Sequence, residues 1–161
     1  MTHYLLSLAL MASIGAPVDH QPLIQAIEGT GVRVTYHHPA CARGTVDGFY
    51  NGDTKTFVIC KGNRPWNEND LDTLRHEATH LLQDCVDGKI DYQMESVTPD
   101  PLAFARASGF KSRDIERLRN AYSSLPYDEF LLEVEAFAAA RSTSAAEIAA
   151  LISQSCPYKK S

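Results

Sequence analysis

Three residues of one short segment have the types and the spacing of two metal ligands and a general base. His76, Glu77 and His80 stand in the run His-Glu-Ala-Thr-His. On an α-helix, residues four positions apart lie on the same face, so both imidazoles can direct a ring nitrogen at one ion. The carboxylate of Glu77 then lies beside the ion, where it can take a proton from a water molecule. This spacing predicts Zn²⁺ as cofactor, with His76 and His80 as ligands and Glu77 as general base.

The surroundings of the motif favour a helix that is partly buried. Such a five-residue pattern arises by accident in roughly one sequence in a hundred of this size, so its context has to support it. Asn69 or Asp70 can cap a helix that runs over residues 71–85, and Gly88 lies beyond its end. The alternative is a solvated helix with incidental histidines. An apolar stripe argues against that alternative and is formed by Leu71, Leu74, Ala78, Leu81 and Leu82.

The third zinc ligand has to come from another part of the chain, because a catalytic zinc ion keeps one position open for water. All other histidines precede the motif, at positions 3, 20, 37 and 38, so a downstream ligand must be a carboxylate. Residues 127–140 supply Glu129, Glu133 and Glu135 in a predicted helix that is otherwise rich in apolar and small residues. A carboxylate in such surroundings needs a partner. The spacing leaves the choice among the three open.

The motif and the glutamate-bearing segment together resemble the gluzincin metallopeptidases, in which an HExxH helix is followed by a helix that contributes a glutamate ligand. The stretch Glu133-Val134-Glu135-Ala136 is similar to the Glu-x-x-Ala ligand helix of several such families, including the peptidases that accompany phage and mobile-element repressors. That similarity implies Glu133 as the third zinc ligand. It further implies a zincin-like fold, metallopeptidase activity and a peptide or protein substrate.

A second alignment of the same segment chooses a different glutamate. The stretch from Glu129 to Glu133 resembles the Glu-Phe-x-x-Glu ligand helix of lethal-factor-like toxin peptidases, and this match implies Glu129. The first match also departs from its families at Phe137, where they carry Asp or Asn. We take Glu133 as the predicted ligand and keep Glu135 and Glu129 as alternatives.

Several further residues could serve such a site. Tyr122 or Tyr127, just before the ligand helix, could donate a hydrogen bond to the oxyanion that forms when water attacks a carbonyl. The alternative is that both tyrosines pack or lie on the surface. Asp84, one turn beyond His80, could orient a histidine or lie in water at the helix end. The segment 56–59 could be an edge strand that binds an extended peptide, or an interior strand.

Strand and helix patterns occupy separate parts of the chain. The first third combines a helix at 19–28 with alternating, β-branched segments that predict strands at 32–36, 46–50 and 56–60. Asn51-Gly52-Asp53 joins the last two as a hairpin, so we expect a small antiparallel sheet packed on the HExxH helix. The fold class is therefore α+β, with a helical C-terminal half. That half contains predicted helices at 71–85, 99–107, 112–123, 128–141 and 144–153.

The length of the chain limits the number of domains, and its charge limits the class of binding partner. With 161 residues, of which 44% are hydrophobic, the chain can bury one core, and we expect a single domain over residues 17–161. The net charge is −5 and no Lys/Arg cluster precedes Lys159-Lys160, which makes nucleic acid a poor partner. The sequence does not indicate an oligomeric state.

The cysteines predict disulfides rather than a metal site. Cys41, Cys60, Cys85 and Cys156 include no Cys-x-x-Cys pair, which excludes a zinc knuckle or a thioredoxin-like motif. We predict that Cys41 pairs with Cys60, because they flank a strand-turn-strand unit, and that Cys85 pairs with Cys156. Disulfides persist in oxidising compartments, so this pairing would agree with export. The alternative is four buried thiols.

The N-terminal segment is apolar from Tyr4 to Ala16 and ends in small residues. Its length suits the core of a signal peptide and is too short to span a bilayer, so no membrane span is predicted. The start of the chain lacks the usual basic residue, however, and a buried N-terminal helix over 1–16 is the alternative. Cleavage after Gly15 would place the protein outside the cell or in the periplasm. Without cleavage we expect a cytoplasmic location.

These patterns lead to one main hypothesis and two alternatives. The main hypothesis is a zinc metallopeptidase that hydrolyses peptide bonds, with Glu77 as general base and with His76, His80 and Glu133 as zinc ligands. The first alternative is a catalytically inactive binding or regulatory module that keeps the zincin fold. The second is a zinc hydrolase of a non-peptide amide, because a metal and a general base do not dictate the scissile bond.

Overall fold

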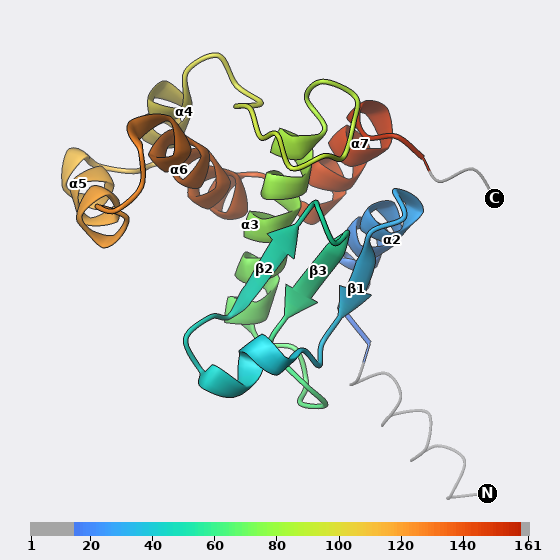
Figure 1. Ribbon diagram of the computed structural model, residues 1–161. Helices are drawn as coiled ribbons and strands as arrows, with labels where there is room; N and C mark the ends of the chain where they lie inside the picture. The colour runs from blue at the N-terminus through green and yellow to red at the C-terminus, as the bar shows by residue number, and fades with distance from the viewer. Residues whose placement is uncertain (1–14, 159–161) are drawn as a thin grey trace, which may run out of the picture.

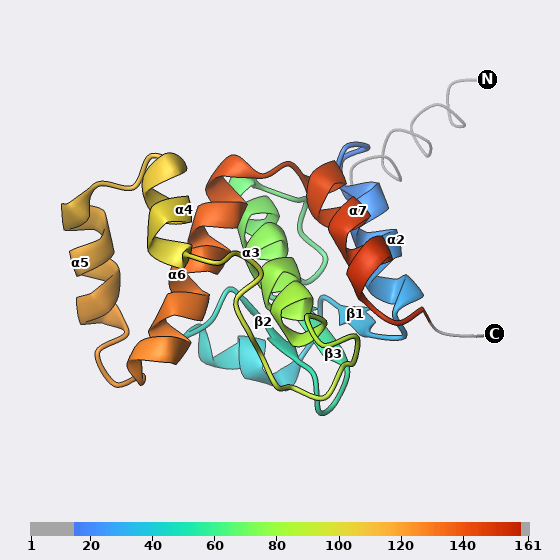
Figure 2. The same ribbon diagram turned by 90° about the horizontal axis from the view of Figure 1, so that it is seen from above.

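The structure, a computed structural model, describes residues 15–158 of the chain. It is an α+β structure with a small three-stranded sheet and a larger helical part (Figure 1). Seen from above, the helices stand side by side, and the sheet lies along one side of α3 (Glu68–Asp84), the helix that carries the HExxH motif (Figure 2). The predicted α+β class is confirmed.

The sheet is mixed rather than antiparallel. Its central strand is β3 (Thr56–Ile59), with β1 (Arg33–Thr35) parallel to it on one side and β2 (Gly48–Asn51) antiparallel on the other. The expectation of an antiparallel sheet is therefore wrong for the pair β1 and β3. Between β1 and β2 the chain forms a 3-10 helix, η1 (Pro39–Arg43), instead of a tight turn, and it crosses to the far side of β3. The segment 56–59 is thus an interior strand, and the sheet edges belong to β1 and β2.

The turn between β2 and β3 is the predicted hairpin. The side-chain oxygen of Asn51 accepts hydrogen bonds from the N–H of Thr54 at 2.8 Å and from its hydroxyl at 3.0 Å. Position 52 requires glycine, because a Cβ there would collide with the carboxylate of Asp84. The hairpin therefore packs closely against the end of α3.

Helix α3 begins one turn earlier than its apolar stripe suggests. Asn67 is the N-cap: its side chain accepts a hydrogen bond from the N–H of Asp70, and Asp70 accepts one from the N–H of Asn67, both at 2.9 Å. Asp70 also accepts two hydrogen bonds from the guanidinium of Arg64, at 2.5 and 2.6 Å. The predicted N-caps, Asn69 and Asp70, are therefore wrong. The first turn of α3 is polar, so apolar periodicity does not reveal it.

The remaining helices follow the predicted order and differ from it by a few residues at their ends. A capping box starts the last of them. The hydroxyl of Ser144 accepts from the N–H of Glu147 at 3.2 Å, and the carboxylate of Glu147 accepts from the N–H of Ser144 at 2.8 Å. The bounds are α2 (Gln21–Gly29), α4 (Pro101–Ala107), α5 (Ser112–Ala121), α6 (Tyr127–Ser142) and α7 (Ala145–Ser155).

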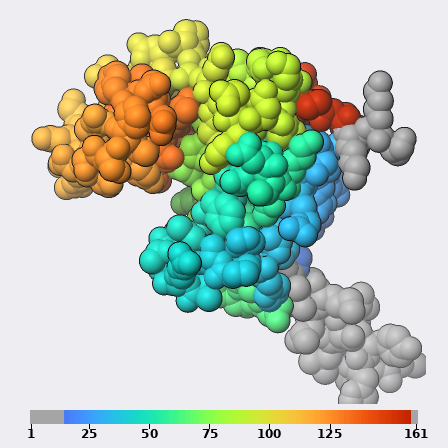
Figure 3. Space-filling model, in the orientation of Figure 1, coloured from blue at the N-terminus to red at the C-terminus, as the bar shows by residue number. Residues whose placement is uncertain are grey.

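Two apolar clusters hold these elements together. The larger lies between the sheet, α2, α3 and α7 and includes the fully buried Phe57, Leu74 and Leu81. The smaller lies between α4, α5 and α6, around Phe130 and Val134. Helix α6 packs beside α3 and so joins the two clusters (Figure 2). Between α6 and β2 the molecule is hollowed, as the surface in Figure 3 shows.

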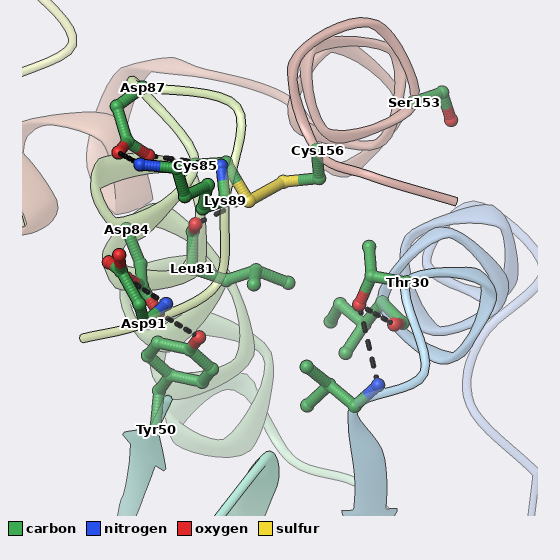
Figure 4. The surroundings of a disulfide bond; sticks show 12 residues. Thr30, Tyr50, Leu81, Asp84, Cys85, Asp87, Lys89, Asp91, Ser153 and Cys156 are labelled. Atoms are coloured by element: carbon green, nitrogen blue, oxygen red, sulfur yellow. Dashed lines mark hydrogen bonds and ion pairs between the residues drawn. A yellow bond between two sulfur atoms is a disulfide. The ribbon is translucent and has the colours of Figure 1, made fainter. Parts of the chain in front are cut away.

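Both predicted disulfides are present. Cys41 in η1 is bonded to Cys60 directly after β3. Figure 4 shows the other disulfide, between Cys85 at the end of α3 and Cys156 at the end of α7. Because disulfides persist in oxidising surroundings, they suggest such a compartment for the protein. The predicted signal peptide or N-terminal helix lies outside the described residues, except for positions 15 and 16. Within residues 15–158, no helix is long and apolar enough to cross a membrane.

Candidate metal centre

One turn of α3 places the two histidines of the motif side by side. Nε2 of His76 lies 3.2 Å from Nε2 of His80. Glu133 of α6 completes the group, since its two carboxylate oxygens lie 3.4 Å from Nε2 of His76 and 3.5 Å from Nε2 of His80. All three side chains are largely buried. The structure thus brings together the three residues that were predicted as zinc ligands.

The two imidazole nitrogens are spaced much like neighbouring ligands of a tetrahedral zinc site. Zinc binds imidazole nitrogen at about 2.0–2.1 Å and carboxylate oxygen at about 2.0–2.2 Å, so the ligand atoms of a tetrahedron lie about 3.3–3.5 Å apart. Here the two nitrogens lie 3.2 Å apart, and the distances of 3.4 and 3.5 Å run to two different oxygens of Glu133. With one oxygen of Glu133 taken, the three ligand atoms lie within 4.8 Å of one another. Two imidazole nitrogens and one carboxylate are also a donor set that catalytic zinc takes, with a fourth position left open. The group could therefore hold a metal ion such as Zn²⁺.

The pKa values of Glu133 and His80 are shifted by the groups that surround them. Burial raises the pKa of the Glu133 carboxyl, but hydrogen bonds and charge from His76 and His80 outweigh this effect and bring the pKa to about 2. Burial lowers the pKa of His80, whereas the hydrogen bond to Glu133 and the charges of Glu77 and Glu133 raise it to about 9. The carboxylates therefore favour a cation at this point, either a proton or a metal ion.

Glu77 lies beside this group and faces the cleft. Its Oε2 accepts a hydrogen bond from the N–H of Tyr50, 3.0 Å away, which ties the carboxylate to the edge of β2. Two hollows of about 860 and 680 Å³ meet here, and both are lined by His76 and Glu77. The larger hollow is bounded by β2, the loop 92–96 and the first half of α6. A substrate in this cleft can therefore reach the predicted base and the metal-binding group together.

The two alternative glutamates of α6 are placed differently. Glu135 is buried, and its carboxylate accepts hydrogen bonds of 2.6 to 2.9 Å from Gln83 and from the loop residues 97–98. Glu129 is exposed in the wall of the larger hollow, one turn before Glu133. Two residues along a helix correspond to about 200° of rotation, so Glu135 faces away from the histidines when Glu133 faces them.

Gln83 is the residue of this region that the sequence patterns did not single out. It is fully buried three residues after His80, and its Oε1 lies 2.7 Å from Nδ1 of that histidine. Its Nε2 donates to the carbonyl of Leu132 and to the carboxylate of Glu135, both at 2.9 Å. The sequence offers one signal for this residue. Position 83 directly follows the apolar stripe of α3, and an amide that is buried there needs hydrogen-bond partners.

Asp84 neither orients a histidine nor lies in water, so both expectations for it are wrong. It is fully buried and accepts hydrogen bonds from the hydroxyl of Tyr50 at 2.5 Å and from the N–H of Asp91 at 3.2 Å (Figure 4). Burial and the neighbouring Asp84 raise the pKa of the Tyr50 hydroxyl above its usual range. Asp84 therefore ties α3 to β2 and to the loop that follows α3.

The structure separates the two candidate tyrosines. Tyr122 lines both hollows, and burial together with the charges of Glu133 and Glu77 raises its pKa to about 12. Its hydroxyl is therefore protonated and able to donate a hydrogen bond at neutral pH. Tyr127 lines neither hollow and is 56% exposed, with its ring against Phe130. Of the two, only Tyr122 is placed to meet a substrate.

The two histidines are held in different ways. Nδ1 of His80 meets Gln83, whereas Nδ1 of His76 is buried and has no hydrogen-bond partner among residues 15–158. The ring of His76 packs on Phe137 instead, with 4.4 Å between the ring centroids. Phe137 is also the position that departs from the gluzincin pattern. An aromatic ring thus covers His76.

Comparisons of this chain with protein-family models, with curated proteins and with solved structures find no match.

Proposed function

We propose that the protein is a zinc-dependent metallopeptidase of the gluzincin type, with a zincin-like packing of the sheet on the HExxH helix. The observation that supports this most is the group of His76, His80 and Glu133, whose ligand atoms lie within 4.8 Å of one another, with Glu77 beside it in an open cleft. A glutamate from a second helix is also the ligand that the gluzincin resemblance implies. The two disulfides agree with a protein that works in an oxidising compartment.

In this proposal the chain supplies the base, the ligands and an oxyanion donor. Zinc would polarise the scissile carbonyl and lower the pKa of a water molecule. Glu77 takes the proton of the attacking water and later delivers it to the leaving amine. The hydrogen bond from the N–H of Tyr50 orients the Glu77 carboxylate for both transfers. Tyr122 donates a hydrogen bond from its hydroxyl to the oxygen that becomes negative as the carbonyl is attacked.

The substrate that we infer is a peptide bound in extended form along β2. This strand is an edge of the sheet, and its Tyr50 N–H leaves the sheet to reach Glu77. A peptide that lies along this edge is next to the base, and its side chains alternate between the two sides of the strand. The Tyr50 N–H itself stays with Glu77. The peptide-binding edge is therefore β2 in this proposal, because the segment 56–59 lies between two strands.

The replacement Glu77→Gln tests the proposal, because it removes the base and keeps the size of the side chain. We expect the variant to bind zinc like the wild type and to cleave a peptide library about 10²–10⁴-fold more slowly. Glu116→Gln, the same substitution at an exposed position of α5, is the matched control and should keep both properties. Zinc content and peptide turnover are measured on all three proteins.

The outcomes separate the hypotheses. Cleavage by the Glu77→Gln protein at the wild-type rate would contradict the role of Glu77. Wild-type protein that binds zinc and cleaves no peptide would indicate the binding or regulatory module instead. Hydrolysis of small amides without peptide cleavage would indicate the non-peptide hydrolase.

A further inference from the structure

Gln83 is a fully buried polar side chain whose hydrogen-bonding groups all have partners. Its Oε1 lies 2.7 Å from Nδ1 of His80, and its Nε2 lies 2.9 Å from both the carbonyl of Leu132 and a carboxylate oxygen of Glu135. Burying an amide without partners is costly. These three contacts are therefore what allows a glutamine to occupy this position between α3 and α6.

The partners of Gln83 fix which way its amide points. A main-chain carbonyl and a carboxylate can only accept, so the NH₂ group must face Leu132 and Glu135 and the amide oxygen must face His80. An amide oxygen cannot donate, and so Nδ1 of His80 must carry the proton of that hydrogen bond. In the neutral imidazole this leaves the lone pair on Nε2. Nε2 is the atom that faces His76 and Glu133.

Glu135 holds the amide of Gln83 in this orientation. Its carboxylate also accepts from the N–H of Val97 at 2.9 Å and from the N–H and hydroxyl of Thr98, both at 2.6 Å. Four hydrogen bonds leave a buried carboxylate little freedom to rotate. Leu132, the other partner of Gln83, directly precedes Glu133 on α6. One amide thus contacts a histidine of the metal-binding group and the helical turn that carries its glutamate.

The other histidine lacks such support, because Nδ1 of His76 has no hydrogen-bond partner in the described part of the chain and its ring rests on Phe137. We propose that Gln83 is the positioning residue of the metal centre. It holds His80 in the tautomer that presents Nε2 to the ion. This inference rests on the metal site of the proposed function and does not depend on the bond that is cleaved.

Two substitutions of Gln83 test the roles of its amide oxygen and its NH₂ group separately. Gln83→Met keeps the length and removes both functions, and we expect the dissociation constant for Zn²⁺ to rise about 10–100-fold. Gln83→Glu keeps an oxygen that accepts from His80 and loses the NH₂ group, so zinc affinity should change less than about threefold while the protein unfolds more easily. Both are measured by competition with a chromogenic chelator and by thermal unfolding of the metal-free protein.

Thr98→Val is the matched control for a purely structural effect. It removes one hydrogen bond to Glu135 and leaves the contact between Gln83 and His80 in place. We expect lower thermal stability with unchanged zinc affinity. A loss of zinc affinity as large as that of Gln83→Met would mean that stability alone controls binding, and it would overturn the inference.

A readout that needs no metal is the imidazole proton on Nδ1 of His80. We expect a slowly exchanging, hydrogen-bonded Nδ1 proton in ¹H–¹⁵N spectra of the metal-free wild type, present in Thr98→Val and absent in Gln83→Met. Wild-type zinc affinity in Gln83→Met, or the absence of this proton from the wild type, would overturn the role of Gln83. Stoichiometric zinc without peptide cleavage would contradict the proposed function and leave the role of Gln83 intact.

Discussion

The backbone N–H of Tyr50 donates a hydrogen bond to Oε2 of Glu77, across 3.0 Å between the edge of β2 and the middle of α3. This contact joins two parts of the proposed site that lie far apart in the sequence. It places the general base at the strand along which we expect the substrate to bind. The hydroxyl of the same tyrosine donates a hydrogen bond to Asp84 at 2.5 Å, so the strand and the helix are held together at the base and about two turns further along α3.

The identity of the third ligand can be tested by comparing two glutamates of α6. Glu133→Gln removes the carboxylate charge that faces both histidines, and we expect it to lower zinc affinity by more than about 100-fold. Glu129→Gln should leave zinc affinity unchanged, because this residue lies one turn away in the cleft wall. Chelator competition on both variants is the measurement. Loss of zinc in Glu129→Gln alone would support the toxin-peptidase alignment instead.

Tyr122 is expected to act on the reaction and not on the metal. In Tyr122→Phe we expect kcat/KM for a cleaved peptide to fall about 10²-fold, since one donor to the oxyanion is lost, with the zinc content unchanged. Tyr127→Phe makes the same chemical change at a position that lines neither hollow and should keep the wild-type rate. Equal rates for the two variants would show that Tyr122 does not contact the reacting carbonyl.

Asp70 makes the stability of α3 depend on pH. Burial raises the pKa of this carboxyl, but hydrogen bonds from Arg64 and from the N–H of Asn67 outweigh burial, so the folded-state pKa is lowered. A lowered pKa contributes stability above the unfolded-state pKa of about 3.9, and this stability is lost as the pH falls through the folded value. We expect Asp70→Asn to lower the free energy of unfolding by about 1–3 kcal/mol at pH 7.

The same comparison at lower pH tests the cause of this effect. As Asp70 of the wild type takes up its proton, the two proteins should converge in stability below about pH 4. Urea unfolding at pH 7 and at pH 3 is the measurement. A difference that is as large at pH 3 as at pH 7 would show that the charge of Asp70 is not its source.

The two disulfides should differ in their contribution to stability. They close segments of 19 residues for Cys41–Cys60 and 71 residues for Cys85–Cys156. Chain-entropy arguments give about 2–4 kcal/mol for a typical disulfide and about 1 kcal/mol more for the longer of these two. Paired Cys→Ser variants, unfolded in urea, check this order. A larger loss from the Cys41–Cys60 pair would contradict it.

Features that depend on local spacing could be predicted from the sequence. The α3 helix follows from its apolar stripe, and the disulfide pairs follow from the positions of the cysteines beside predicted elements. The parallel pairing of β1 with β3 could not be derived, because it depends on where a connection of irregular structure takes the chain. A hairpin signal exists only between β2 and β3.

Within the site, the residues of the motif were predictable and their supports were not. Glu133 and Glu135 differ by the face of α6 on which they lie, and which face meets α3 is a property of the tertiary packing. Gln83 is an ordinary glutamine in the sequence, since its partners Leu132 and Glu135 lie about fifty residues away. Asp84 likewise meets Tyr50 only because the hairpin returns to the end of α3.

The most direct test of the proposed function is a zinc titration of the metal-free protein with peptide cleavage as the readout. Protein stripped by a chelator is expected to cleave no peptide, and activity should rise linearly to a plateau at one equivalent of Zn²⁺. In His76→Ala, neither zinc binding nor cleavage should be restored at that ratio. Cleavage that persists in the metal-free protein, or a wild-type protein that binds no zinc, would contradict the proposal that His76, His80 and Glu133 form a catalytic zinc site.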